Sequence, residues 1–204
     1  SIKEIQKNWI GKSKGASVNF KLENSEDKIE VFTTRPDTIF GVNFMVLAPE
    51  HELVNKITAS SQKNDVEAYI NTAKLKSERD RQADKSVSGV FTGAHAIHPF
   101  TGEKVQVWIG DYVLASYGTG AVMAVPCGDQ RDWDFATHFG LEIINIFEGV
   151  DVSEIANEDK NVNIANSDFL SGLSAEKAMH LAIQKIEEGG FGKEKINYRL
   201  RDAI

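Results

Sequence analysis

Residues 118–126 read GTGAVMAVP, two glycines followed by an apolar run that ends at a proline. Glycine lets a backbone or a ligand approach closely, so this stretch predicts a tight turn that leads into a buried strand. A phosphate-binding P-loop would need a Gly-Lys-Ser/Thr ending, and the dinucleotide fingerprint would need a third glycine and a helix. The sequence has neither pattern, so the turn either approaches another kind of ligand or only leads the chain into a core strand.

Strand-like segments surround this run. Residues 16–22 and 28–34 are joined by a polar turn, and a short apolar run follows at 44–48. From Gly89 to Val125 we expect further short strands separated by turns, at 90–91, 94–97, 105–109 and 112–114. Many short strands with turn signals are typical of a small barrel or sandwich.

Helices are expected around this β core. We predict a helix over 1–8, one opened by Pro49-Glu50, a charged exposed helix or helical pair over 65–85, one over 129–139 that ends at Gly140, and one over 175–188 capped by Ser174. The polar stretch 150–166 predicts a surface loop. No repeat or linker divides the chain, so residues 1–204 are expected to form one domain of mixed α/β class.

Composition limits the setting. The 204 residues are 41% hydrophobic and 26% charged, which suits one soluble domain with a sizeable core. No apolar run approaches membrane-spanning length, and the single cysteine, Cys127, excludes an internal disulfide, so we expect a cytoplasmic protein. The net charge of -7 suits only small or assisted contacts with RNA. The first residue is not Met and the last residues follow an apparent strand, so we expect a piece of a larger chain.

A second constellation, TTRPDT at residues 33–38, lies where a strand is expected to end. Pro36 disfavours the helical backbone conformation at Arg35, and it has no N–H to donate to a neighbouring strand. Hydroxyls, a guanidinium and a carboxylate therefore crowd one corner. Threonine hydroxyls can orient a water or hold an ester carbonyl without titrating. From the residues alone, a turn in which Asp37 and the threonines satisfy backbone groups is the favoured explanation.

The third constellation is DQRD at residues 129–132, at the start of an expected helix. Asp129 is placed to cap the helix and Asp132 lies at the third helical position, where both complement the helix dipole. The same field favours an ionised Asp132, which would suit an α-ammonium group. Arg131 would suit a phosphate. Capping alone also explains the pattern.

Together these segments resemble the editing domain of bacterial-type leucyl-tRNA synthetases. TTRPDTIFG at 33–41, YGTGAVM at 117–123 and DQRD at 129–132 look like its three signatures, in the same order. WIGKS at 9–13 and NYRLRD at 197–202 look like the places where this insertion leaves and rejoins the catalytic domain. The related isoleucyl and valyl domains share GTGAV but carry a different first motif and lack DQRD. One departure is Cys127-Gly128, where many bacterial members have Gly-His.

The resemblance implies a small closed β-barrel decorated with helices, inserted into a class I synthetase. It implies hydrolysis of tRNA(Leu) mischarged with norvaline or isoleucine, because a leucine pocket rejects a methyl difference by only about 1–3 kcal/mol. The implied partners are the 3′ CCA end of the tRNA and the rest of the synthetase in cis. Editing would need no metal or cofactor, since ATP serves only the synthetic domain. The chain alone would be monomeric.

The resemblance also implies roles for particular residues. Asp132 would bind the α-ammonium group, Thr38 would crowd the pocket so that leucine is excluded, and Thr33 and Thr34 would position the water and the ester. The other expected substrate-binding residues are Arg35 and Arg131 for the RNA end, with Tyr117, Met123, Val125 and Asp129 around the amino acid and the terminal adenosine. One alternative is an isoleucyl or valyl editing domain, and another is a non-catalytic insert that steers the tRNA end.

Overall fold

The computed structural model describes the backbone of residues 8–201 and the side chains of residues 14–197. Apart from Asn8, the helix expected over 1–8 lies outside the described residues. The strands are β1 (Asn8–Leu22), β2 (Lys28–Thr33), β3 (Phe44–Leu47), β4 (Val90–Ile97), β5 (Lys104–Ile109), β6 (Ala121–Ala124) and β7 (Gly192–Arg201). The helices are α2 (Val54–Ile57), α3 (Lys63–Ala73), α4 (Glu78–Ala83), α5 (Gln130–Phe139) and α6 (Ala175–Gly189), with 3-10 turns η1 (Pro36–Gly41), η2 (Ser60–Gln62) and η3 (Asp168–Leu170).

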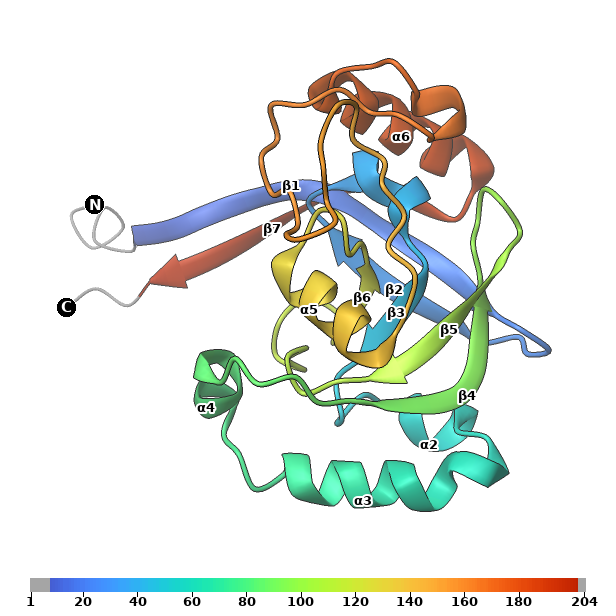
Figure 1. Ribbon diagram of the computed structural model, residues 1–204, viewed down its shortest axis with the longest axis vertical. Helices are drawn as coiled ribbons and strands as arrows, with labels where there is room; N and C mark the ends of the chain where they lie inside the picture. The colour runs from blue at the N-terminus through green and yellow to red at the C-terminus, as the bar shows by residue number, and fades with distance from the viewer. Residues whose placement is uncertain (1–7, 202–204) are drawn as a thin grey trace.

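The strands form one mixed sheet in the order β2-β1-β4-β5-β3-β6, with β7 paired to β1 outside this order. β3 runs parallel to β5, and the other paired strands are antiparallel. β1 is long enough to pair first with β7, then with β2 and finally with β4. In Figure 1 β1 and β7 leave the body of the molecule side by side as a two-stranded ribbon.

The expected closed barrel is wrong, because the sheet stays open within the described residues. β2 and β6 lie at the two ends of the strand order, and no ladder joins them. Each strand is closely followed by a proline, Pro36 or Pro126, which cannot donate to a ladder. A side chain spans the gap instead, since the Thr119 hydroxyl donates to the carbonyl of Glu30 in β2. The mixed α/β class is confirmed.

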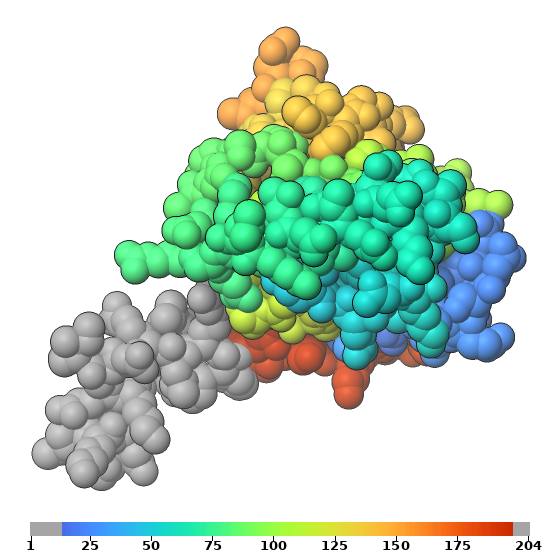
Figure 2. All heavy atoms as spheres, turned by 90° about the horizontal axis from the view of Figure 1, so that it is seen from below, coloured from blue at the N-terminus to red at the C-terminus, as the bar shows by residue number. Residues whose placement is uncertain are grey.

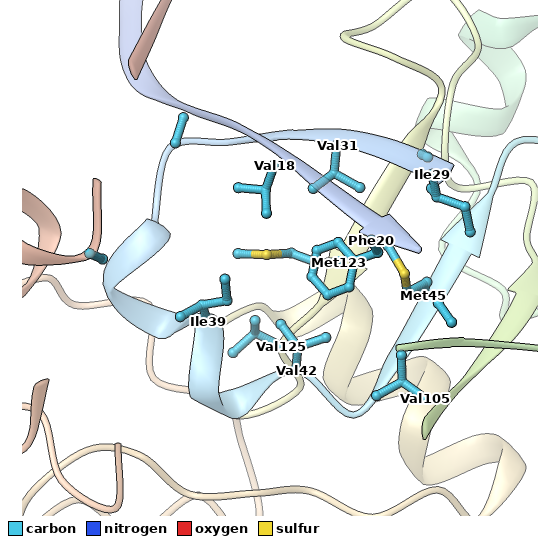
Figure 3. Close-up of a cluster of buried hydrophobic side chains, with 14 of the residues drawn as sticks. Val18, Phe20, Ile29, Val31, Ile39, Val42, Met45, Val105, Met123 and Val125 are labelled. Carbon is cyan, nitrogen blue, oxygen red and sulfur yellow. The ribbon is translucent and has the colours of Figure 1, made fainter. Parts of the chain in front are cut away.

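The main core lies between the sheet, η1 and α6. Apolar side chains from several strands and η1 meet in it (Figure 3), among them Val18, Phe20, Val31, Ile39, Met45 and Met123. α6 adds a face of small residues that includes Ala178 and Ala182, so the helix packs closely against η1. Burial of this face fixes η1, and therefore the TTRPDT segment, against the sheet.

The expected helices mostly form where the sequence places them. α3 and α4 are the helical pair predicted over 65–85, and with α2 they cover the face seen in Figure 2, in cyan to green. α5 ends at Gly140 and α6 begins after the Ser174 cap, both as expected. None of the described helices is long and apolar enough to cross a membrane.

Two expected elements do not form. Pro49-Glu50 lies in a turn, and the short α2 begins only at Val54. Residues 112–114 are a loop and not a strand. The reason is tertiary: the buried Arg81 guanidinium takes up the carbonyls of Asp111 and Val113, so these groups need no strand partner.

His98 ties the turn after β4 to η1. Its side chain is 3% exposed, and its Nε2 lies 2.8 Å from the carbonyl of Ile39. Its Nδ1 accepts the backbone N–H groups of Phe100 and Thr101, each at 3.2 Å. Nδ1 must therefore be unprotonated, and Nε2 donates to Ile39. The ring is neutral, and burial lowers the pKa of His98.

We therefore expect the free energy of unfolding to fall as the pH drops below about 6.5, the ordinary histidine value. Unfolded His98 takes up a proton there, whereas the folded ring resists protonation until its lowered pKa is reached. The loss is at most about 1.4 kcal/mol per pH unit for this group. Urea unfolding between pH 7.5 and 5 measures it, with His98→Gln reducing the pH dependence. The control His180→Gln, at an exposed position, should leave it unchanged, and an equal effect of both variants would contradict the assignment.

Candidate functional site

The TTRPDT segment forms a turn between β2 and η1 that is held by its own threonines. The Thr33 hydroxyl oxygen accepts the backbone N–H of Arg35 at 3.0 Å. The Thr38 hydroxyl donates to the carbonyl of Arg35 at 2.8 Å, and the Thr38 N–H donates to the same oxygen at 3.0 Å. Thr38 is buried, whereas Thr33 and Thr34 are partly exposed. The corner thus has the satisfied backbone that a structural turn requires, with two hydroxyls in fixed positions.

Arg35 is paired within the same turn. Its Nη2 lies 2.9 Å from Oδ2 of Asp37, and its Nε lies 3.1 Å from Oδ1. The Asp37 carboxylate is buried, and the arginine covers it. Such a fork-like pair fixes both side chains and compensates the burial of the carboxylate charge. Arg35 therefore lies at the expected corner, with its guanidinium held against Asp37.

The GTG stretch forms the expected tight turn into a buried strand. Gly118 and Gly120 have φ values of +59° and +72°, in the left-handed region that glycine adopts without strain. β6 then pairs antiparallel with β3, so that Met123 lies opposite Met45. Met123 and Val125 are buried, and the turn residue Tyr117 is exposed. In Figure 3 Val125 lies beside Val42, close to the end of η1.

DQRD opens α5 with the expected cap. An Asp129 oxygen accepts the backbone N–H of Asp132 at 2.9 Å, and the Asp129 side chain remains exposed. Asp132 itself is only 6% exposed. Its Oδ2 accepts the backbone N–H of Val125 at 3.0 Å, and its Oδ1 accepts the Tyr112 hydroxyl at 2.6 Å. A carboxylate from α5 is therefore fixed against the end of β6.

The surroundings of Asp132 act against the ionised form that the helix dipole favours. Burial, followed by the charge of Asp129, raises the pKa of Asp132 to about 8. The hydrogen bonds from Tyr112 and Val125 and the charge of Arg131 lower the pKa but do not offset burial. Desolvation outweighs the helix dipole here, because the dipole acts weakly compared with removal of a carboxylate from water.

Val125 and Cys127 are where the three segments meet. The Val125 N–H holds Asp132, and an ideal Cβ on Gly41 of η1 would lie 3.1 Å from Cγ1 of Val125. Cys127 lies close enough to Arg35 for the guanidinium charge to act on its thiol, although burial raises the pKa of Cys127 to about 11. The thiol is therefore protonated at neutral pH and unsuited to act as a nucleophile.

Two positions lie differently from the sequence expectation. Arg131 points toward α4, where its Nη2 donates to the carbonyl of Asp84 at 3.3 Å and its guanidinium lies 5.6 Å from the Tyr112 ring centre. At Gly128 an ideal Cβ would lie 3.2 Å from the Phe147 ring. A histidine at this position, as in the Gly-His pattern, would require Phe147 to move.

Sequence reasoning missed Tyr112. Tyr112 lies within the strand that the sequence predicts over 112–114. No local pattern indicates that its hydroxyl contacts Asp132, which lies on a helix further along the chain. A weak signal existed in the preceding Gly110-Asp111 turn, because a side chain next to a turn often leaves the sheet.

Comparison with known proteins agrees with this arrangement. The family model described as "Leucyl-tRNA synthetase, editing domain" matches residues 7–187. The leucine–tRNA ligase of Christiangramia forsetii is 65% identical over 206 residues, which cover 100% of this chain and 21% of that protein. The leucine–tRNA ligase of Bacteroides thetaiotaomicron is 52% identical over 214 residues, covering 100% of this chain and 23% of that protein.

A solved structure is also similar. It is the agnB2 LeuRS of Agrobacterium radiobacter K84 in a ternary complex with tRNA and LeuAMS. The TM-score is 0.74 at 33% identity, and the match covers 98% of this chain and 22% of that chain.

The fold and the three converging segments, with matches of this extent, define an editing domain of an aminoacyl-tRNA synthetase, a class with hydrolytic editing activity. The chain belongs to the leucyl-tRNA synthetase editing-domain family. It spans about a fifth of the length of these ligases, at 21% and 23%. The predicted family is therefore confirmed.

Proposed function

We propose that this chain hydrolyses the ester of tRNA(Leu) mischarged with a non-leucine amino acid, such as norvaline or isoleucine, and leaves leucyl-tRNA(Leu) intact. The observation that carries the proposal is the buried Asp132 carboxylate, fixed against the end of β6 where the threonine segment also packs. Among the described residues Asp132 takes part in no ion pair.

An α-ammonium group would supply the counter-charge that Asp132 lacks. The pKa of Asp132 is raised to about 8, so this carboxyl holds a proton for much of the time at neutral pH. A cation in contact with the carboxylate lowers that pKa and favours the charged form. Binding of an aminoacyl ester would therefore release the proton from Asp132 and form a buried ion pair with the α-ammonium group. A neutral side chain at position 132 could not form this ion pair.

The threonine hydroxyls have hydrogen-bonding capacity left for substrate. Thr33 uses its oxygen as an acceptor for the Arg35 N–H, so its O–H remains free to donate to a water or an ester carbonyl. Thr38 uses its O–H as a donor to the Arg35 carbonyl, so its lone pairs remain available to accept from a water. The partly exposed Thr34 lies between them in the chain, which supports a shared role in positioning the ester and the water.

Thr38 also suits the role of a size filter. Its Cβ is branched, which restricts χ1, and the hydrogen bond to the Arg35 carbonyl fixes the remaining freedom. A buried methyl group that cannot move aside excludes a side chain that is branched where leucine is. This fits a second, hydrolytic sieve that removes what the synthetic pocket fails to reject.

In the proposed reaction, water attacks the ester carbonyl and the bond to the ribose oxygen breaks. The products are the free amino acid and a tRNA with its terminal hydroxyl restored. Because an aminoacyl ester is already activated toward water, the proposal includes no metal or cofactor for editing. Tyr117, exposed at the GTG turn, would contact the terminal adenosine, while Met123 and Val125 would form the floor beneath the amino acid.

The proposed partner is the CCA end of tRNA(Leu), delivered by the rest of a cytoplasmic synthetase of which residues 1–204 form the editing domain. The solved relative is itself in a complex with tRNA, which supports this partner. The net charge of -7 predicts weak tRNA binding by the monomeric chain alone. Spare guanidinium donors of Arg35 and Arg131 would contact phosphates, with Asp129 at the rim of the site.

The first test is deacylation of isoleucyl-tRNA(Leu) against leucyl-tRNA(Leu) at high concentration of this chain. We expect the isoleucyl ester to be lost at least tenfold faster. If neither ester is lost, the same assay on the full-length synthetase decides. If the full-length synthetase hydrolyses the isoleucyl ester, the inactivity of this chain alone is due to weak tRNA binding. If it does not, the result supports a non-catalytic insert that only steers the tRNA end.

Thr38→Ala should make the domain hydrolyse leucyl-tRNA(Leu), because the pocket gains the room of a methyl and a hydroxyl. An increase of about 10- to 200-fold in the rate for the leucyl ester is expected from the value of such a contact. Thr92→Ala is a matched control, since Thr92 is also buried and donates to a carbonyl, but in β4. An unchanged leucyl rate in Thr38→Ala would remove its role as a filter.

Asp132→Ala should lower kcat/KM for isoleucyl-tRNA(Leu) by about 10- to 100-fold, because the ammonium loses a charged acceptor. Asp134→Ala removes an acidic side chain from the same helix and should have little effect. A fully active Asp132→Ala variant would contradict the ammonium assignment.

A further inference from the structure

Tyr112 contacts Asp132 from a loop that the three sequence motifs do not include. The loop lies between β5 and β6, and the Tyr112 hydroxyl donates to Oδ1 of Asp132 at 2.6 Å. This distance lies at the short end of the range for O–H···O hydrogen bonds. The second oxygen, Oδ2, accepts the Val125 N–H at 3.0 Å. One donor on each oxygen fixes the plane of the carboxyl group as well as its position.

The backbone on either side of Tyr112 is held by Arg81. The Arg81 Nε donates to the carbonyl of Asp111 and Nη2 donates to the carbonyl of Val113, each at 2.9 Å. Arg81 is 3% exposed, and its Nη1 pairs with Glu50 at 2.6 Å. A planar guanidinium that takes two carbonyls two residues apart leaves the intervening residue little freedom.

The Tyr112 ring is fixed by α5. Its centre lies 5.7 Å from that of Phe135, and the Arg131 guanidinium lies 5.6 Å from the ring centre on the same helix. Ring contacts and cation–π contacts of this kind are favourable and directional. The backbone and the ring are therefore both held, and the hydroxyl has a defined place.

We propose that Tyr112 is a positioning residue that orients the Asp132 carboxylate toward the substrate ammonium, and that Arg81 keeps Tyr112 in place. This inference rests on the proposed function. Two donors from separate parts of the chain, the Tyr112 hydroxyl and the Val125 N–H, would orient the carboxylate, and the substrate ammonium would be its third donor. Tyr112 acts through Asp132 and does not itself touch the reacting ester.

The pKa of Asp132 reports on this role, because it depends on the groups that surround the carboxyl. The groups that face it are Tyr112 from the loop, the Val125 N–H from β6, and Asp129 and Arg131 from its own helix. Burial and Asp129 raise the pKa of Asp132, whereas the Tyr112 hydrogen bond lowers it. Burial and the Asp132 charge raise the pKa of Tyr112 well above its usual value, so the phenol keeps its proton and remains a donor.

A purely structural brace is the competing explanation, and Tyr69 provides the matched control. The Tyr69 hydroxyl accepts the backbone N–H of Asp111 at 2.8 Å and bonds Ser88 at 2.8 Å. Tyr69→Phe therefore removes a hydroxyl of α3 that holds the same loop, without touching Asp132. If Tyr112 only braces the loop, Tyr69→Phe and Tyr112→Phe should have similar effects.

The experiment titrates the Asp132 carboxyl carbon by NMR in this chain, in Tyr112→Phe and in Tyr69→Phe, with thermal unfolding to show that each variant folds. We expect an upward shift of the Asp132 pKa in Tyr112→Phe and none in Tyr69→Phe. An unchanged Asp132 titration in Tyr112→Phe, or an equal shift in both variants, overturns the proposal. This arm needs no turnover, so it is independent of the proposed function.

The second arm measures hydrolysis of isoleucyl-tRNA(Leu) by the same variants in the full-length synthetase between pH 6 and 8. We expect Tyr112→Phe to lose about tenfold in kcat/KM near pH 6.5, with partial recovery at higher pH as Asp132 ionises. Tyr69→Phe should keep the original pH profile. A shifted titration with unchanged hydrolysis would overturn the positioning role. Absence of hydrolysis in the unmodified enzyme would instead overturn the proposed function.

Discussion

The carboxylate of Asp132 accepts a hydrogen bond from each of two segments that lie apart in the sequence, and the site depends on this contact. Through the N–H of Val125 it joins α5 to the end of β6, which itself packs against η1 and the threonine segment. Through Tyr112 it joins α5 to the loop after β5. Without this carboxylate α5 would lose its hydrogen bonds to the end of β6 and to the loop after β5.

Burial makes the Asp132 carboxyl costly to ionise. Its pKa is raised to about 8, although it sits in the first turn of a helix. The buried carboxylate of Asp37, in the turn between β2 and η1, differs from Asp132 because it is paired with the Arg35 guanidinium. The Asp37 carboxylate thus has a charged partner within the fold, whereas Asp132 takes part in no ion pair among the described residues.

Much of the fold could be predicted from local pattern. The strands at 16–22 and 28–34, the pair α3 and α4, and the capped helices α5 and α6 formed as expected, because alternation, caps and glycines act within a few residues. The closed barrel and the strand at 112–114 were wrong. Both depended on long-range partners: a ladder that two prolines prevent, and carbonyls that Arg81 takes.

The sequence by itself determined the family and the identity of the three motifs, because these are recognised from residue types at fixed spacing, which the sequence contains in full. It also placed Asp129 as a helix cap, a contact that spans one turn. The tertiary structure alone decided that burial raises the pKa of Asp132 and that the Tyr112 hydroxyl donates to it. Both depend on how far water is excluded and on which segments meet, and those quantities arise only when distant parts of the chain pack together.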